Sequence, residues 1–298
     1  MRDAFVERLI ELAREDESIE LLTGDLGFGV LRPFKNEFPD RFHNVGIAEQ
    51  LLIEMATGMA MAGKKVVCYS IGNFPVLRCL EQIRNDAVYS GANVKIVEIG
   101  GGYTYGQLGM SHNATEDMAA LLSIPNIAIY TPSDKYEAEL ATELMLKQQG
   151  TTMLRLERPD ARTIHDDPIA DYASENVIKC HGGAGTAVLS YGGISVVAKE
   201  IALARGYAFY SFPMLKPLNE QAIKAELSGY ERLVVVEEHS KRGGLGSIIE
   251  SLFASEKKHP IVLKYGLPHE YASVIGSQDY MRDSVGLSKE KLLKAIGD

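Results

Sequence analysis

The chain has 298 residues, 46% of them hydrophobic and 24% charged, with a formal net charge of −9 at pH 7. This balance is typical of a globular protein, and the length leaves room for two domains. The acidic charge argues against nucleic acid or an anionic membrane as the main partner. No apolar run reaches the roughly 20 residues of a membrane span, and the first residues do not read as a signal peptide.

The cysteines and histidines provide no recognisable metal motif. Cys68, Cys79 and Cys180 are odd in number and widely spaced, which fits free thiols in a reducing compartment. The seven histidines are dispersed and form no H-x-x-x-H pair. The sequence therefore predicts a cytoplasmic protein whose own side chains hold no metal.

Hydrophobic periodicity predicts alternating helices and strands in the first half of the chain. The expected helices span 1–15, 47–62, 77–91, 117–122 and 134–148, and residues 34–40 form a short polar segment. The expected strands span 19–23, 66–70, 94–99, 127–130 and 152–156. This alternation favours a mainly parallel sheet with helices on its faces.

A second, smaller alternation begins near residue 177, after a stretch rich in proline and aspartate. Its expected strands span 186–190, 208–211 and 233–237, and its helices span 194–205 and 219–228, with another opening at 243–246. We therefore expect an α/β protein with a first domain at 1–162, a linker at 163–176 and a second domain at 177–298. Each domain should hold a mainly parallel sheet flanked by helices.

Common nucleotide-binding and hydrolase motifs are absent. The glycines near residues 183–193 do not complete a G-x-G-x-x-G turn, and no G-x-x-x-x-G-K-[ST] loop occurs. No G-x-S-x-G elbow is present either. Dinucleotide binding and serine hydrolysis therefore have no support.

One ordered set of motifs stands out. It begins with V-G-I-A-E-Q at 45–50, Y-S-x-x-N-F at 69–74 and a glycine-rich loop at 100–112 that ends in S-H. L-S-I-P-N at 122–126 and V-V-V-E-E-H at 234–239 follow. Alone, a glutamate in the first turn of a helix is an ordinary stabilising carboxylate. The whole series, however, resembles the pyrimidine-binding and C-terminal domains of transketolase, and is also similar to deoxyxylulose-phosphate synthase.

This resemblance implies the cofactor thiamine diphosphate and assigns three residues to its chemistry. Glu49 matches the glutamate that bonds to the pyrimidine ring nitrogen and exchanges a proton with it. Phe74 matches the aromatic that stacks on the pyrimidine. His112 matches the histidine near the thiazolium, which donates to substrate oxygens.

Four further positions are implied with looser matches. Asp25 falls where the family has an aspartate near the cofactor, although a turn-forming Gly-Asp reads equally well. Arg158 matches an arginine that binds the sugar phosphate, and Arg2 falls at the spacing of a second one. Leu77 stands where a second aromatic is common in the cofactor site.

Departures from the family pattern concern the substrate. Leu108 replaces an aspartate that reads a substrate hydroxyl, and Gly100 replaces a histidine that binds phosphate. A donor or acceptor without the standard hydroxyl and phosphate pattern is therefore expected.

The diphosphate end of the cofactor requires a binding site on another chain. In the family a G-D-G…N motif binds the diphosphate and Mg²⁺, whereas Gly24-Asp25 is followed here by leucine. The resemblance thus implies the C-terminal subunit of a split transketolase, which transfers two-carbon ketol units together with an N-terminal subunit in an α2β2 heterotetramer. The alternatives are the beta subunit of a 2-oxo acid dehydrogenase, a pyruvate-using deoxyxylulose-type synthase, and a non-catalytic regulatory subunit.

Overall fold

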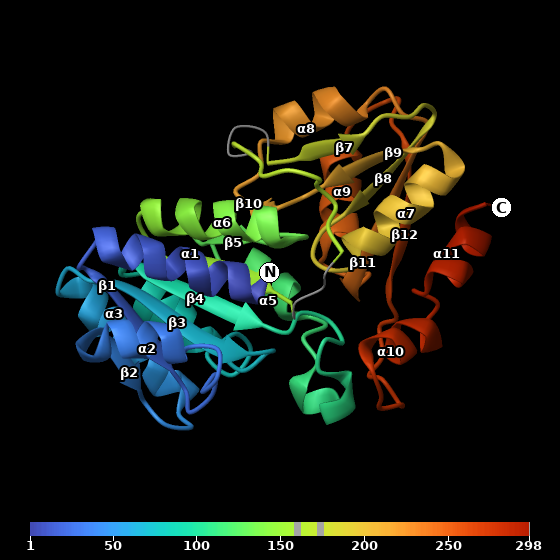
Figure 1. Ribbon diagram of the computed structural model, residues 1–298. Helices are drawn as coiled ribbons and strands as arrows, with labels where there is room; N and C mark the ends of the chain where they lie inside the picture. The colour runs from blue at the N-terminus through green and yellow to red at the C-terminus, as the bar shows by residue number, and fades with distance from the viewer. Residues whose placement is uncertain (158–161, 172–175, 298) are drawn as a thin grey trace.

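The computed structural model describes residues 1–157, 162–171 and 176–297. In these residues the strands form two separate sheets, each mainly parallel and flanked by helices (Figure 1). This arrangement confirms the predicted α/β fold class. None of the helices in the described ranges combines the length and the hydropathy that a membrane span needs.

The first sheet has seven strands in the described residues, in the order β10-β5-β6-β4-β3-β1-β2. These are β1 (Ile19–Thr23), β2 (Phe42–Asn44), β3 (Lys65–Ile71), β4 (Val94–Ile99), β5 (Ala128–Tyr130), β6 (Thr152–Leu156) and β10 (Met214–Lys216). Neighbouring strands are parallel except at the β5 edge, where β10 runs antiparallel. Because β10 comes from the second half of the chain, the two halves are joined through one sheet.

Helices cover both faces of the first sheet. They are α1 (Arg2–Glu15), α2 (Arg32–Glu37), α3 (Glu49–Met61), α4 (Leu80–Gln82), the π-helical turn η2 (Ile83–Val88), α5 (Asp117–Leu122) and α6 (Lys135–Lys147). Short 3-10 turns lie at η1 (Pro39–Arg41), η3 (Gly106–Leu108) and η4 (Met110–His112). The strand side chains alternate between the two faces, so Val67 packs with α1 and α6 whereas Cys68 packs with α3 and η2. A sheet covered on both sides explains why its strands are apolar at nearly every position.

The second sheet has five strands in the described residues, in the order β12-β11-β8-β9-β7. These are β7 (Ile178–His181), β8 (Thr186–Ser190), β9 (Ala208–Ser211), β11 (Arg232–Ser240) and β12 (Ile261–Leu267). The helices are α7 (Ser195–Arg205), α8 (Glu220–Leu227), α9 (Leu245–Phe253), α10 (Gln278–Ser284) and α11 (Lys289–Ile296). All pairs are parallel except β7 with β9.

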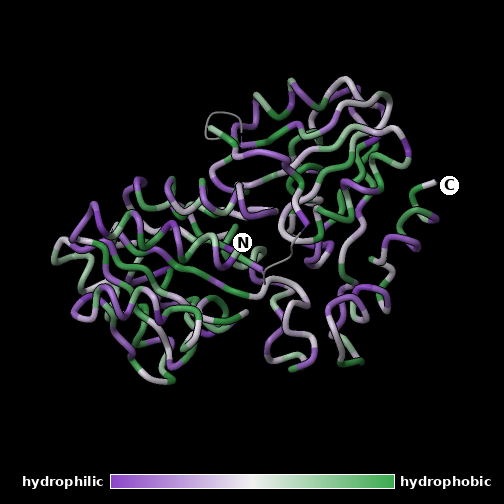
Figure 2. The backbone as a smooth tube through the Cα atoms, viewed as in Figure 1, coloured by the Kyte–Doolittle hydropathy of each residue, from purple (hydrophilic) through white to green (hydrophobic). Residues whose placement is uncertain are grey.

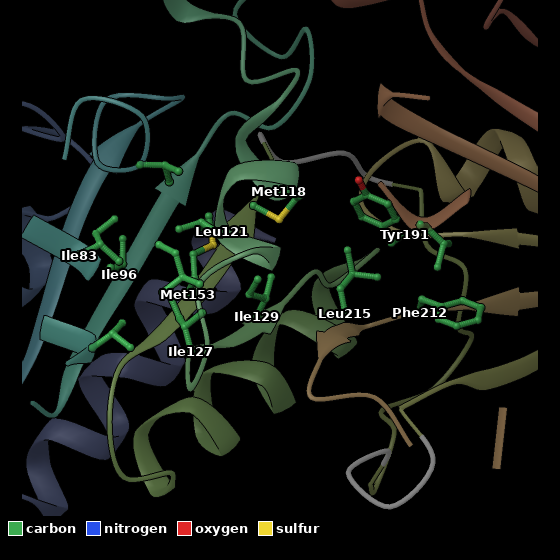
Figure 3. Packing of buried hydrophobic residues seen from close by; sticks show 14 of the residues in the cluster. Ile83, Ile96, Met118, Leu121, Ile127, Ile129, Met153, Tyr191, Phe212 and Leu215 are labelled. Atoms are coloured by element: carbon green, nitrogen blue, oxygen red, sulfur yellow. The ribbon is translucent and has the colours of Figure 1, made fainter. Parts of the chain in front are cut away.

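A shared hydrophobic core joins the two sheets. Ile96 and Met153 from the first sheet belong to the same buried cluster as Tyr191 and Phe212 from the second half (Figure 3). Leu215 on β10 lies between these groups (Figure 3). Figure 2 shows hydrophobic residues concentrated along the strands, with polar residues on the outer helices. The site described below therefore stands on a scaffold whose two halves pack together.

The structure differs from the sequence prediction mainly in short elements. The helix expected at 77–91 begins as α4 and continues as the π-helical turn η2. The polar segment at 34–40 contains most of α2, which has Pro33 in its first turn, where proline is tolerated. The sequence did not predict β2, β7, β10, β12, α10 and α11. Most of these elements are short, and packing against neighbours decides their structure more than periodicity does.

Candidate active site

The carboxyl ends of four parallel strands bring the candidate residues to one edge of the first sheet. Thr23 is in register with Asn44 and Tyr69, and Ile71 is in register with Ile99. The segments that follow these strands carry Asp25, Glu49, Phe74 and His112. This edge is where parallel α/β sheets usually place their ligands.

Glu49 is the first residue of α3 and is only 4% exposed. The preceding turn includes Gly46 at φ +78°, a backbone conformation that favours glycine. The Glu49 carboxylate accepts a hydrogen bond from Arg78 Nη1, with 2.7 Å between Nη1 and Oε2. The helix N-terminus and this cation together compensate a buried negative charge.

Phe74 and His112 lie against each other beside this pair. Their ring centroids are 5.0 Å apart and the ring planes meet at 64°, an edge-to-face contact. Arg78 Cζ lies 4.4 Å from the centroid of the Phe74 ring. Glu49, Arg78, Phe74 and His112 therefore form one connected cluster.

Close approach of two loops holds this cluster together. Asn73 Nδ2 donates to the Asn113 carbonyl at 2.9 Å. A Cβ on Gly72 would lie 2.9 Å from the His112 carbonyl oxygen, so a larger residue would push the loop away. Glycine at residue 72 thus allows the histidine loop to approach the phenylalanine turn.

The environment of the cluster shifts the pKa values of two side chains, His112 and Cys79. Burial, and to a lesser degree the charge of Arg78, lower the pKa of His112 below its ordinary value, so the ring is neutral at neutral pH. His112 Nδ1 lies 3.0 Å from Ser111 Oγ. Burial raises the pKa of Cys79 to about 12, with a further contribution from Glu49, so this thiol does not act as a nucleophile.

Asp25 adopts a left-handed backbone conformation, with φ +57°, at the end of β1. Asn44 Nδ2 donates to its carboxylate at 3.0 Å, and Asn44 Oδ1 accepts from the backbone N–H groups of Asp25 and Gly46. The neighbouring Gly24 would bring an added Cβ to 3.9 Å from Glu49 Cγ. Asp25 thus follows directly after the residue that lies beside the Glu49 side chain. Its hydrogen bonds with Asn44 stabilise the turn that precedes α3.

The remaining predicted residues are more dispersed. Leu77 is half-buried and borders a cavity of about 830 Å³. Leu108 is 53% exposed, four residues before His112. Arg2 Nε donates to Asp3 at 2.9 Å on its own helix, and within the described residues it makes no hydrogen bond or ion pair with the cluster. Arg158 lies outside the described residues.

The cavity beside the cluster lies between the two halves of the chain. Asn73, Leu77 and Asn113 line one side, and Arg242 and residues 267–272 line the other. Its volume is within the range of small-molecule sites. The second half therefore contributes part of the wall beside the predicted site.

The glycine-rich loop has a role that the sequence did not reveal. Glycines allow close approach of the backbone to a neighbour, and a Cβ on Gly102 would lie 2.5 Å from Cγ of Glu238 on β11. The Glu238 carboxylate also accepts the Tyr103 N–H at 2.8 Å. This part of the loop is thus packed against the second half of the same chain.

The family models match both halves of the chain. The transketolase pyrimidine-binding domain matches residues 1–163, and the transketolase C-terminal domain matches residues 178–292. The chain belongs to the transketolase family. This result confirms the membership predicted from the ordered motifs.

Several relatives share this architecture. One of the subunits of an apulose-4-phosphate transketolase from Phocaeicola vulgatus is 31% identical, over 98% of this chain and 95% of that protein. The 1-deoxy-D-xylulose-5-phosphate synthase of Haemophilus ducreyi is 31% identical, over 94% of this chain but 45% of that protein. Among solved structures, an inactive β4 tetramer of a split-gene transketolase has a TM-score of 0.89 and 26% identity, covering 99% of this chain and 96% of that one. The transketolase relatives thus include separate subunits of the same extent as this chain.

The cluster suits one end of thiamine diphosphate, the cofactor that the family implies. A buried carboxylate beside an aromatic ring face can bind a flat heteroaromatic ring that has a basic nitrogen. By contrast, the described residues contain no group of three or more His, Cys, Asp or Glu side chains able to hold a metal ion. The residues of this cluster therefore fit the pyrimidine end of the cofactor.

Arg78 is the member of this cluster that the sequence did not reveal. Arg78 lies four positions after Phe74. A search for cations close in sequence to the expected stacking aromatic would have found it. Its pairing with Glu49, 29 residues earlier, has no periodic signal in the sequence.

Proposed function

We propose that the chain is one subunit of a thiamine diphosphate-dependent transketolase-type transferase, which moves a two-carbon ketol unit from a ketose to an aldehyde. The observation that carries this proposal is that the buried Glu49 carboxylate and the Phe74 ring belong to one cluster, in which Arg78 contacts both. A partner subunit supplies the site for the diphosphate and Mg²⁺.

When bound, the cofactor supplies an electron sink for the carbanion that forms as the ketose is cleaved. Glu49 holds and exchanges a proton at the pyrimidine ring nitrogen. Phe74 stacks on that ring and orients it. Both roles need groups that are fixed before the cofactor arrives, and the α3 N-terminus and the residue 72–74 turn supply that rigidity.

His112 acts on the substrate side of the cluster. Its neutral ring can donate one N–H to a substrate oxygen where negative charge develops, and the other nitrogen is within reach of Ser111. Asp25 and Leu77 border the cofactor, and Leu108 borders the sugar. Arg2 and Arg158 remain proposed phosphate ligands, of which Arg2 would need to leave Asp3.

Exposed apolar residues around Glu49 support a partner subunit. Leu51 and Met55 are 48% and 36% exposed and lie one helical turn apart on one side of α3, and Ile47, in the turn before the helix, is 80% exposed. Such a stripe next to a half-built site favours burial against another chain. We propose two copies of each chain in the complete enzyme, because family sites of this kind lie between subunits.

The substrate is proposed to be a sugar phosphate outside the usual set. The name of the Phocaeicola vulgatus relative refers to apulose-4-phosphate, which supports a non-standard ketose. Leu108 and Gly100, in place of the family's polar residues, point the same way. A deoxyxylulose-type synthase is the second candidate, supported by the 31% identity to the Haemophilus ducreyi enzyme.

The domain boundaries at 162 and 177 and a cytoplasmic location also stay proposals. The location is supported by three free cysteines.

Reconstitution with a partner chain that carries the G-D-G…N motif tests the function. The pair should transfer two-carbon units, whereas the isolated chain should show no turnover and little affinity for thiamine diphosphate by calorimetry. Glu49→Gln should lower kcat by about 10²- to 10⁴-fold, because general acid–base catalysis contributes that much.

Glu54→Gln is the matched control, since Glu54 is exposed on the same helix. Near-normal turnover of Glu49→Gln would refute the assigned mechanism. Tight Mg²⁺-dependent binding of the cofactor by the isolated chain would refute the shared site. Thermal unfolding of both variants checks that they are folded.

A further inference from the structure

Arg78 contacts both of the residues that are proposed to bind the pyrimidine ring. Its Nη1 donates to Glu49 Oε2 at 2.7 Å, and its Cζ lies 4.4 Å from the centroid of the Phe74 ring. In the described residues no other cation contacts Glu49. The two functional groups of the proposed cofactor site are thus engaged by one side chain of the same chain.

The guanidinium group has the chemistry that these two contacts require. It is planar and delocalised, it presents N–H donors at its edge, and it stacks on aromatic faces. A pyrimidine ring that bonds to Glu49 and stacks on Phe74 makes the same pair of contacts. Arg78 therefore competes with the pyrimidine ring for the Glu49 carboxylate. Where both groups stack on the same face of Phe74, it competes for that face as well.

The side chain of Arg78 is far more exposed than that of Glu49. Its side chain is 47% exposed, whereas that of Glu49 is 4% exposed. Its contacts to Glu49 and Phe74 are made by the guanidinium group at the end of a long side chain. The arginine can withdraw toward solvent without disrupting the core, while the carboxylate stays buried.

We propose that Arg78 is a displaceable placeholder for the pyrimidine ring in the subunit without cofactor. It satisfies the buried Glu49 carboxylate until the cofactor replaces it, because a buried charge left unpaired would destabilise the fold. The placeholder also weakens cofactor binding, since its ion pair must be broken first. This inference rests on the proposed function, and it adds a residue that controls loading of the site.

The decisive measurement is the Kd of thiamine diphosphate, with Mg²⁺, for the enzyme assembled with its partner subunit. Arg78→Gln removes the charge of the competing group and should tighten binding by about tenfold or more, because hydrogen bonds to charged groups are the strong ones. Arg84→Gln, an exposed arginine six residues later, should leave the Kd unchanged. Equal or weaker binding by Arg78→Gln would overturn the proposal and make Arg78 a fixed positioning residue. Failure of the wild-type complex to bind the cofactor would instead refute the proposed function, and this inference with it.

A second test measures unfolding free energies, first in the free subunit without cofactor and then in the loaded enzyme. Glu49→Gln, Arg78→Gln and the double variant form a cycle of unfolding free energies, measured in the free subunit and in the loaded enzyme. The two substitutions should be coupled in the free subunit and independent in the loaded enzyme. Equal coupling in both states would overturn the displacement, and so would no coupling in the free subunit.

The pKa of His112, followed by NMR in the free subunit, checks where Arg78 lies. Because the charge of Arg78 contributes to the lowered pKa of His112, Arg78→Gln should raise that pKa toward the ordinary value. His112→Asn identifies the resonance among the seven histidines. No change in the pKa would overturn the placement of the guanidinium beside Phe74 and His112.

Discussion

Individual residues at the sheet edge divide into the cluster of Glu49, Arg78, Phe74 and His112 and the exposed part of the glycine-rich loop that carries Leu108. Glu49 and Phe74 are held by backbone structure that other residues cannot easily replace, as Gly72 illustrates. Leu108, by contrast, is 53% exposed, and its side chain is not part of the buried core. Under the proposed function, a substitution at residue 108 should therefore alter substrate choice without disturbing the cofactor-binding cluster.

Leu108→Asp should improve the use of ordinary ketose phosphates, because an aspartate there would accept a hydrogen bond from a substrate hydroxyl. We expect kcat/KM for such a ketose to rise by about tenfold, the effect of one hydrogen bond to a charged group. The comparison is the ratio of kcat/KM values for a standard ketose phosphate and for the native donor. An unchanged ratio would show that residue 108 does not contact the sugar, and Gln107→Asp, at an exposed residue of the same 3-10 turn, controls for added charge.

Among the elements, α3 combines two functions on opposite sides. Its inner side contributes Leu52, Ile53 and Ala56 to the core, and its first residue is the buried Glu49. Its outer side exposes a separate row of apolar residues that includes Leu51. A helix that is apolar on both sides is explained if the outer side is buried by another subunit.

Leu51→Glu should prevent assembly with the partner while leaving the isolated subunit stable. Leu51 is 48% exposed, so the unfolding free energy should change by no more than about 0.5 kcal/mol. Burial of a charge at the centre of an interface should weaken association by about 30-fold or more, which corresponds to about 2 kcal/mol.

Sedimentation or light scattering of the mixed subunits measures this assembly. Leu203→Glu is the matched control, because Leu203 on α7 is also 48% exposed. Normal assembly of Leu51→Glu would place the partner on another surface.

At the scale of the whole molecule, the second half of the chain holds the loop that leads to His112. Arg282 Nε donates to Glu238 at 2.9 Å, and the same carboxylate accepts the backbone N–H of Tyr103. Arg155 on β6 donates to Asp117 at 2.7 Å and to the Ala114 carbonyl at 3.0 Å, just beyond the loop. The glycine-rich loop is thus fixed at its base by buried charges of both halves.

Gly102→Ala should destabilise this junction and misplace His112. The added Cβ would meet Glu238 at 2.5 Å, and the residue has φ +61°, so both sterics and backbone oppose alanine. We expect the unfolding free energy to fall by more than about 1 kcal/mol.

Chemical denaturation measures the change, and the assembled enzyme should lose kcat as well. Gly182→Ala is the control, since a Cβ there would meet open space. Equal stability of the two variants would show that the loop does not depend on the second half.

The sequence alone determined the fold class, the family and the group of residues formed by Glu49, Phe74 and His112. Periodicity of apolar residues is a local property, and ordered motifs keep their spacing, so both can be read along the chain. Only the tertiary structure decided that β10 completes the first sheet, that Arg78 pairs with Glu49, and that Glu238 packs against the glycine-rich loop. Those contacts join residues that are 29 to 136 positions apart, from Glu49 and Arg78 to Gly102 and Glu238. Their energies depend on burial and distance in space, which no local pattern records.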